Sequence, residues 1–115
     1  MRYLLMICND EREILAMTPD EDAAMLGRYG KFSEEIAAKG ILRDAARLRP
    51  TTDATTVRVR DGEVLTSDGP FAETKEQIGG YFMVDCKDLD EAIDVASKIP
   101  HAGNGTIEVR PVWEM

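Results

Sequence analysis

Apolar positions fall into short runs, some with the spacing of strands and others with that of helices. The runs Tyr3–Cys8 and Tyr81–Cys86 are largely apolar at both parities, as in strands that are covered on both faces. Between them, residues 55–60 alternate with a period of two, and Asp61-Gly62 leads into a returning segment at residues 63–66. This pattern predicts a β-hairpin closed by a type I′ turn.

Helical spacing begins after a clear start signal. Thr18 can act as the N-cap, Pro19 suits the first helical position, and Glu21 completes a capping box. The apolar residues then recur at spacings of four, three and four, which places Met25, Tyr29, Phe32 and Ile36 on one face. Gly40 predicts the end of this helix.

A second helix is predicted to start at Asp88, with Glu91 three residues later, and to stop at Pro100. The residues expected on its buried face are Leu89, Ala92, Ile93, Ala96 and Ile99. Residues 41–48 are a weaker strand candidate and residues 106–112 a closing strand. Residues 9–17 and 67–80 are expected to be loops, with room for one helical turn near Ile14-Leu15 and a short one at residues 73–76. The elements therefore alternate as strand, helix, strand, hairpin, strand, helix, strand.

This order predicts an α+β fold, a ferredoxin-like βαββαβ sandwich with an inserted β-hairpin. Right-handed crossovers place both helices on one face of the sheet. The other face would be bare, yet the two apolar runs have apolar residues on both faces. We therefore expect a homodimer in which two sheets pack face to face.

Composition excludes several classes of partner. The 115 residues fit a single domain, 1–115, and 14 basic against 22 acidic residues give a net charge of −8. That charge disfavours nucleic acid and anionic membranes, and no apolar run is long enough to span a bilayer. No signal peptide is recognisable, so the cytoplasm is the expected location.

Cysteine and histidine give no sign of a metal or cofactor. Cys8 and Cys86 fit no disulfide or metal spacing and are expected to be buried free thiols. His101 is the one histidine, which excludes a zinc site with several imidazoles, and its loop position predicts a solvated side chain. Carboxylates alone suit Mg²⁺ or Mn²⁺, but no spacing singles out a ligand set. We expect no cofactor and no metal.

The segment that follows the hairpin has two interpretations. Structurally, Asp68 can cap a turn, Gly69 can adopt a positive φ, Pro70 fixes the exit direction and Phe71 fills an apolar site. Functionally, Asp68 can transfer a proton. Glu73 and Lys75 could then bind or protonate a small acid, or they could form only a solvated ion pair.

Strand parity gives a second set of candidates. If Phe82 and Val84 lie under the helices, then Tyr81 lies on the opposite face, which Glu108 and Arg110 would share. Arg110 would hold an anionic group, Tyr81 would donate a hydrogen bond, and Asp68 or Glu108 would move a proton. These groups suit a small anionic or aromatic molecule. Alternatively, Arg110 and Glu108 pair with each other and fix the register of a dimer interface.

The stretch Ser67–Glu76, followed by Gly79-Gly80-Tyr81, closely resembles the DGPF motif of the YCII-related family, and the strands on either side resemble that family too. The resemblance implies a dimeric α+β barrel. Wider YCII-like proteins have been proposed to be enzymes with a histidine and an aspartate in a cleft. No histidine lies in the first strand or first helix here, so that pair is not carried over.

Two functional hypotheses follow. In the first, the protein binds a small anionic or aromatic molecule, or acts on it as an enzyme, in a pocket inside the dimeric barrel. In the alternative, it is a non-catalytic accessory protein whose acidic surface binds a protein partner. The resemblance implies an extracytoplasmic-function sigma factor as such a partner. Buried polar groups that converge on a cavity would favour the first hypothesis, and a solid interior with a clustered acidic surface the second.

Overall fold

The computed structural model describes residues 1–115 and has one main antiparallel sheet. Its strands, in the spatial order β2-β5-β1-β6, are β1 (Arg2–Asn9), β2 (Leu42–Arg47), β5 (Gln77–Asp85) and β6 (Thr106–Pro111). The helices are α1 (Glu11–Leu15), α2 (Pro19–Ala38) and α3 (Leu89–Ser97), with short 3-10 turns η1 (Thr51–Asp53) and η2 (Pro100–Gly103). This topology confirms the predicted ferredoxin-like α+β class.

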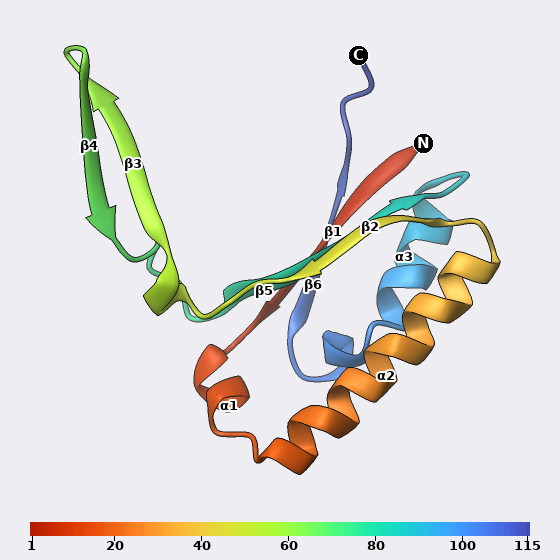
Figure 1. Cartoon of the computed structure of the whole chain (residues 1–115). Coiled ribbons are helices and arrows are strands. Elements are labelled where there is room, and N and C mark those ends of the chain that lie inside the picture. The colour runs from red at the N-terminus through yellow and green to blue at the C-terminus, as the bar shows by residue number, and fades with distance from the viewer.

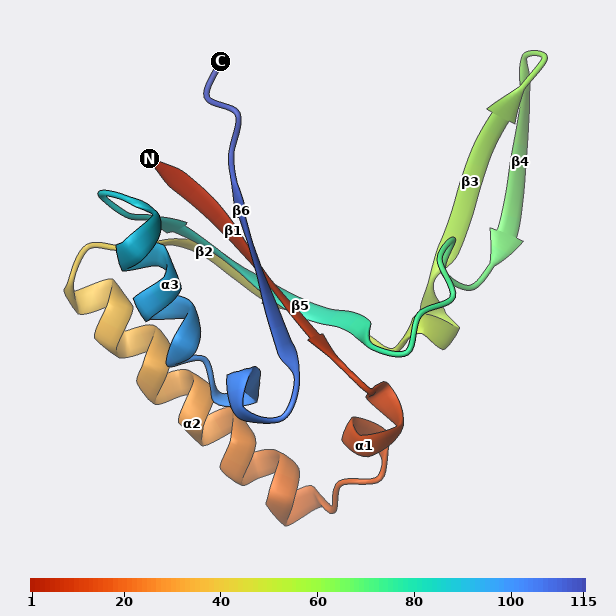
Figure 2. The same cartoon turned by 180° about the vertical axis from the view of Figure 1, so that it is seen from behind.

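The remaining strands, β3 (Thr55–Arg60) and β4 (Glu63–Asp68), pair only with each other. Asp61 and Gly62 both have positive φ, at 52° and 78°, as the predicted type I′ turn requires. This hairpin, residues 55–68, stands away from the rest of the molecule in both views (Figures 1 and 2). We call it the β3–β4 arm.

Helices α2 and α3 cover the same face of the main sheet (Figures 1 and 2). Beneath them, alternate residues of β1 and β5 are buried, so Leu5, Phe82 and Val84 form the centre of the core. Phe32 and Ile36 of α2 pack onto this layer. The opposite face, which we call the open face, has no helix over it. The parity predicted for β5 is therefore confirmed.

The start of α2 has the predicted capping box: Thr18 Oγ1 accepts from Glu21 N at 3.1 Å, and Glu21 Oε1 accepts from Thr18 N at 2.9 Å. Gly40 follows the last turn with φ 72°, a conformation that favours glycine. α2 spans 20 residues, and none of the helices has the length and apolar character needed to cross a bilayer.

The prediction for α3 was partly wrong. Ala92, Ala96 and Ile99 are buried as expected, but Val95 is buried as well. Leu89 and Ile93 are about half exposed. The two alanines let the helix backbone approach the sheet closely, so the buried face centres on them and the larger side chains lie at its margin.

Two predicted loops also contain regular structure. The segment at residues 9–17 includes α1, whose N-cap is Asp10; the Asp10 side chain accepts from Arg12 N at 3.0 Å. The loop expected at residues 67–80 is shorter, because β4 continues to Asp68 and β5 starts at Gln77. Neither the polar end of β4 nor the glycine-containing start of β5 has hydrophobic alternation, so these strand extensions lack a sequence signal.

Candidate functional site

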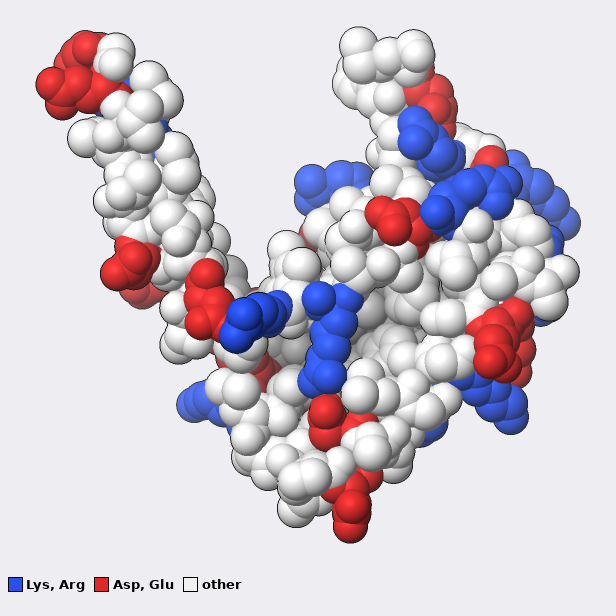
Figure 3. All heavy atoms as spheres, viewed as in Figure 1, with Lys and Arg blue, Asp and Glu red and all other residues white.

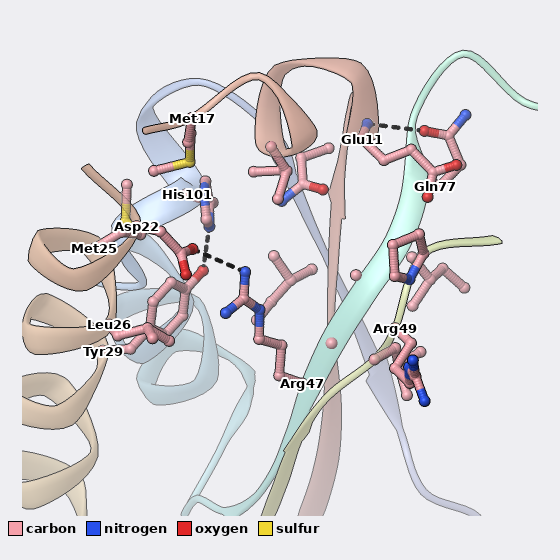
Figure 4. A pocket seen from close by; sticks show the side chains of 18 of the residues that line it. Glu11, Met17, Asp22, Met25, Leu26, Tyr29, Arg47, Arg49, Gln77 and His101 are labelled. Carbon is pink, nitrogen blue, oxygen red and sulfur yellow. Dashed lines mark hydrogen bonds and ion pairs between the residues drawn. The ribbon is translucent and has the colours of Figure 1, made fainter. Parts of the chain in front are cut away.

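A cavity of about 870 Å³ lies on the helix-covered side of the sheet, between α1, the first half of α2 and the β2–β5 edge. Its volume falls in the range of pockets that hold small molecules. About half of its lining residues are apolar, and those from the two helices are Ile14, Leu15, Met25 and Leu26. We call this cavity the groove. Figure 4 shows that several of its polar side chains point toward one another.

The polar centre of the groove is a pair of aromatic side chains, Tyr29 of α2 and His101 of η2. Tyr29 Oη lies 2.6 Å from His101 Nδ1, and their rings are tilted 39° to each other. His101 is only 7% exposed. Its other ring nitrogen, Nε2, has no hydrogen-bond partner in the chain. Every fully buried side-chain nitrogen or oxygen does have a partner, so Nε2 is not fully buried. Nε2 is thus the atom of the pair that remains free for a ligand.

Burial keeps both members of this pair neutral near pH 7. It raises the pKa of Tyr29 to about 12. Burial also lowers the pKa of His101 from its ordinary value of 6.5, and the positive charges of Arg28 and Arg47 lower it further. With one proton between Oη and Nδ1, the pair has two arrangements. Either Tyr29 donates and Nε2 carries a hydrogen, or Nδ1 donates and Nε2 is a free base.

A cation lies beside the aromatic pair. Arg47 of β2 pairs with Gly80 of β5, and its side chain points to the helix side of the sheet. Gly80 has no side chain that would compete with Arg47 for this space. Its Nη2 donates to Asp22 Oδ1 of α2 at 2.9 Å, and both side chains are partly exposed (Figure 4). Exposed ion pairs contribute little net energy, so a ligand anion can replace Asp22 at small cost.

The far end of the groove is closed by contacts between α1 and the β2–β3 connection. Glu11 accepts from Thr51 N at 2.9 Å and also from Thr51 Oγ1, while Gln77 Oε1 accepts from Glu11 N at 3.0 Å. The segment 48–50 and Gln77 line this end of the groove. The same residues lie where the chain leaves the body for the β3–β4 arm and where it returns.

The turn that carries His101 is held by backbone hydrogen bonds. The His101 carbonyl accepts from Gly105 N at 2.7 Å and from Asn104 N at 3.3 Å. A Cβ atom at Gly105 would lie 2.5 Å from the carbonyl oxygen of Cys8 and 3.2 Å from that of His101. Only glycine therefore allows η2 to pack against β1 so closely. The prediction of a solvated His101 was wrong, because this turn folds back under α2 instead of crossing the surface.

The residues predicted from strand parity lie together on the open face. Tyr81 Oη donates to Asp44 Oδ2 of β2 at 2.9 Å, so Asp44 lies on this face too. Arg110 Nη2 lies 2.5 Å from Glu108 Oε2. Glu108 and Tyr81 flank Met6 from either side, about 10 Å apart at two strand spacings. Within one chain the four polar groups thus form two separate pairs, and of the four only Tyr81 is also among the residues that line the groove.

The turn after β4 differs from its expected form. Gly69 has φ 93° as predicted. It is anchored by its own N–H, which donates to Ala54 O at 2.7 Å, and by Thr56 Oγ1, which donates to Gly69 O at 2.7 Å. The Asp68 side chain makes no hydrogen bond, so its expected capping role was wrong. Phe71, beyond Pro70, is 74% exposed rather than inserted into an apolar site, and the Arg58 guanidinium lies 4.9 Å from its ring centroid.

The remaining candidates are peripheral. Glu73 and Lys75 lie in the exposed loop before β5, and no ion pair joins them to each other. Lys75 borders a shallow polar depression between Asp10 and Asn104. Cys86 is buried as expected, whereas Cys8 is only partly buried and lies on the open face. The groove residues Tyr29, Arg47 and His101 were therefore missed as a functional set.

The burial of His101 predicts a pH-dependent stability. Its pKa is lower in the folded protein than in the unfolded chain, so the unfolded chain binds more protons just below pH 6.5. The free energy of unfolding should therefore fall as the pH drops from about 8 toward 5. Denaturant titrations across this range measure the slope. The same titrations on His101→Gln should give a smaller slope, and an equal slope in both proteins would contradict the buried, neutral imidazole.

Comparison with known proteins agrees with this fold. The family model described as the YCII-related domain matches residues 1–115. An uncharacterised protein of Rhizobium meliloti (strain 1021), R00369, is 40% identical over 114 residues, which cover 97% of this chain and 92% of the relative. The relative's description names no ligand or reaction.

Proposed function

This chain belongs to the YCII-related family, and the description of its relative R00369 names no activity, so we propose a function from the chemistry of the groove. The groove binds a small organic anion with an aromatic or aliphatic body, and His101 exchanges a proton with it. The observation that carries this proposal is a buried imidazole, 2.6 Å from a half-buried phenol, beside a partly apolar cavity of about 870 Å³.

Each group of the groove has a distinct role in this proposal. The apolar side chains of α1 and α2 bury the body of the ligand, as pockets of this size do. Arg47 takes the anionic group in place of Asp22, since the guanidinium fork matches a carboxylate or phosphate. His101 Nε2 forms a hydrogen bond with the polar or acidic atom of the ligand.

The partner of His101 decides what the imidazole can do. When Tyr29 donates to Nδ1, Nε2 carries a hydrogen and can donate it to a basic ligand atom. When Nδ1 donates to Tyr29, Nε2 is a neutral base that can accept a proton from an acidic ligand atom. In both arrangements Tyr29 stays neutral, because its pKa is about 12. A ligand therefore selects the tautomer, and Tyr29 acts as a positioning residue.

A thermal-shift titration with benzoate, 4-hydroxybenzoate and hexanoate tests the proposal. A ligand at one hundred times its dissociation constant adds about 2.7 kcal/mol to stability, a rise in melting temperature on the order of 10 °C for a domain of this size. We expect a saturable shift with at least one of these anions. The shift should be strongly reduced in Arg47→Gln and in His101→Gln.

Arg110→Gln is the matched control, because it removes the same charge from the open face. It should leave the shift unchanged. A shift that is lost in Arg110→Gln but kept in Arg47→Gln would overturn the groove as the site and favour the pocket predicted inside the barrel. A flat response to all three anions would also contradict the proposal and would favour the accessory-protein alternative. Acidic and basic side chains are intermixed over the face shown in Figure 3. This face therefore lacks the clustered acidic surface that the accessory-protein alternative predicts.

A further inference from the structure

Asn9 is a polar residue at a position of the core. It is the last residue of β1, and it follows Leu5 and Ile7 on the face that the helices cover. Like those residues it is buried, at only 8% exposed, and it lines the groove. An apolar side chain would continue the core layer here, so packing alone does not account for an amide at this position.

The Asn9 amide has no hydrogen-bond partner in the chain, whereas the polar groups around it are paired. Asp10 caps α1, and Gln77, which pairs with Asn9 across the sheet, is satisfied at both ends. Its Oε1 accepts from Glu11 N, and its Nε2 donates to Thr74 O at 2.7 Å. Every fully buried side-chain nitrogen or oxygen has a partner, so neither polar atom of the Asn9 amide is fully buried. Both atoms are therefore free for a ligand in the groove.

Two glycines leave the space that the Asn9 side chain occupies. A Cβ atom at Gly79 would lie 3.2 Å from Asn9 Oδ1, and one at Gly105 would lie 3.2 Å from Asn9 Cβ. Gly79 has no partner residue on β1, because the register shifts there, and such β-bulges re-aim side chains beside functional sites. The surrounding backbone thus holds the amide in place while its hydrogen-bonding groups stay unused.

We infer that Asn9 is a specificity-determining residue of the groove and that the ligand is an organic anion with a hydroxyl group on its body. This inference rests on the proposed function and names the class of anion. A hydroxyl is the smallest group that both donates and accepts, so it can pair with either half of the amide. A second carboxylate would only accept and an ammonium would only donate. An anion without a hydroxyl would dehydrate the amide and leave it unpaired, which weakens binding.

The sheet places this hydroxyl away from the anionic group. Arg47 lies on β2 and Asn9 on β1, with β5 between them, so two strand spacings, about 10 Å, separate the two residues across the sheet. Asn9 instead adjoins the turn that carries His101, because its Cβ and the His101 carbonyl oxygen flank the same glycine, Gly105. The hydroxyl is therefore the acidic atom that exchanges its proton with His101 Nε2.

Three aromatic acids separate the hydroxyl from the rest of the anion. Benzoate lacks it, 4-hydroxybenzoate carries it opposite the carboxylate, and 2-hydroxybenzoate carries it beside the carboxylate. Isothermal titration calorimetry and thermal shift give the dissociation constant of each. We expect the wild-type protein to bind 4-hydroxybenzoate at least about tenfold more tightly than either of the other two.

Asn9→Leu replaces the amide by an apolar group of similar shape. The preference for 4-hydroxybenzoate over benzoate should fall to within about twofold, while benzoate itself should bind as tightly as before. The melting temperature of the free variant should equal or exceed that of the wild-type protein, because the amide makes no hydrogen bond that the fold would lose. A purely structural amide would give the opposite pattern, a lower melting temperature with the preference unchanged, and would overturn the inference.

Asn104→Leu is the matched control. It makes the same substitution at the only other asparagine, which is exposed and does not line the groove, so the preference should be kept. Wild-type affinities for benzoate and 4-hydroxybenzoate that are equal, and that are both lost in Arg47→Gln, would overturn the role of Asn9 and leave the function of the groove intact. This outcome needs no Asn9 variant and so does not depend on how well Asn9→Leu folds. A flat wild-type response to all three acids would overturn the inference together with the proposed function.

Discussion

Leu5→Ala is expected to lower the free energy of unfolding by about 3–5 kcal/mol. Leu5 is fully buried in β1, one of the two central strands, and it pairs with Phe82 of β5 and Val109 of β6. Removing three carbon atoms there leaves a cavity that rigid strands on either side cannot close. Urea denaturation followed by circular dichroism, at one protein concentration for all variants, measures the loss.

Leu15→Ala is the matched control, because it makes the same substitution at a residue that is 62% exposed, in α1. Its cost should stay below about 1 kcal/mol. If Leu5→Ala cost no more than Leu15→Ala, the assignment of the core to the layer between the sheet and α2 would be wrong.

Gly105→Ala is expected to cost about 2–3 kcal/mol and to disturb the site at the same time. The added methyl group would lie 2.5 Å from the backbone oxygen of Cys8, and neither β1 nor η2 can move away without breaking hydrogen bonds. The turn must shift, and His101 shifts with it. Denaturation gives the cost, and the nuclear magnetic resonance shifts of the His101 ring report the displacement.

Gly103→Ala controls for the loss of glycine in the same turn. A Cβ atom at Gly103 meets nothing within 4 Å, so this variant should change stability by less than about 0.5 kcal/mol and leave the His101 signals in place. Equal effects of the two alanines would show that the packing of η2 against β1 is not what holds the imidazole.

Much of the fold could be predicted from local signals. Alternation placed Phe82 and Val84 under the helices, the Asp61-Gly62 turn fixed the hairpin, and the capping box marked the start of α2. Each of these signals depends on residues only a few positions apart. The face of α3 was misjudged because helical spacing alone leaves two neighbouring stripes, and the close approach of two alanines decides between them.

The site could not be predicted in the same way. Tyr29 was recognised as part of an apolar stripe and Arg47 as a strand residue, but nothing local links them to His101, which is 72 positions from Tyr29. The face of the sheet on which a polar strand residue lies can be inferred only from the alternation of the apolar residues beside it. That reasoning found Arg110 and Glu108 but could not show that they pair with each other instead of facing a cavity.

The two ends of the β3–β4 arm are also walls of the groove: segment 48–50 leads into the arm, and Gln77 follows it. A change in the position of the arm would therefore act first on residues that line the cavity. If another chain binds the arm while a ligand fills the groove, the two binding events share one coupling free energy. Each event then changes the affinity of the other by the same factor. The apparent affinity for the ligand would then depend on the concentration of the chain that binds the arm.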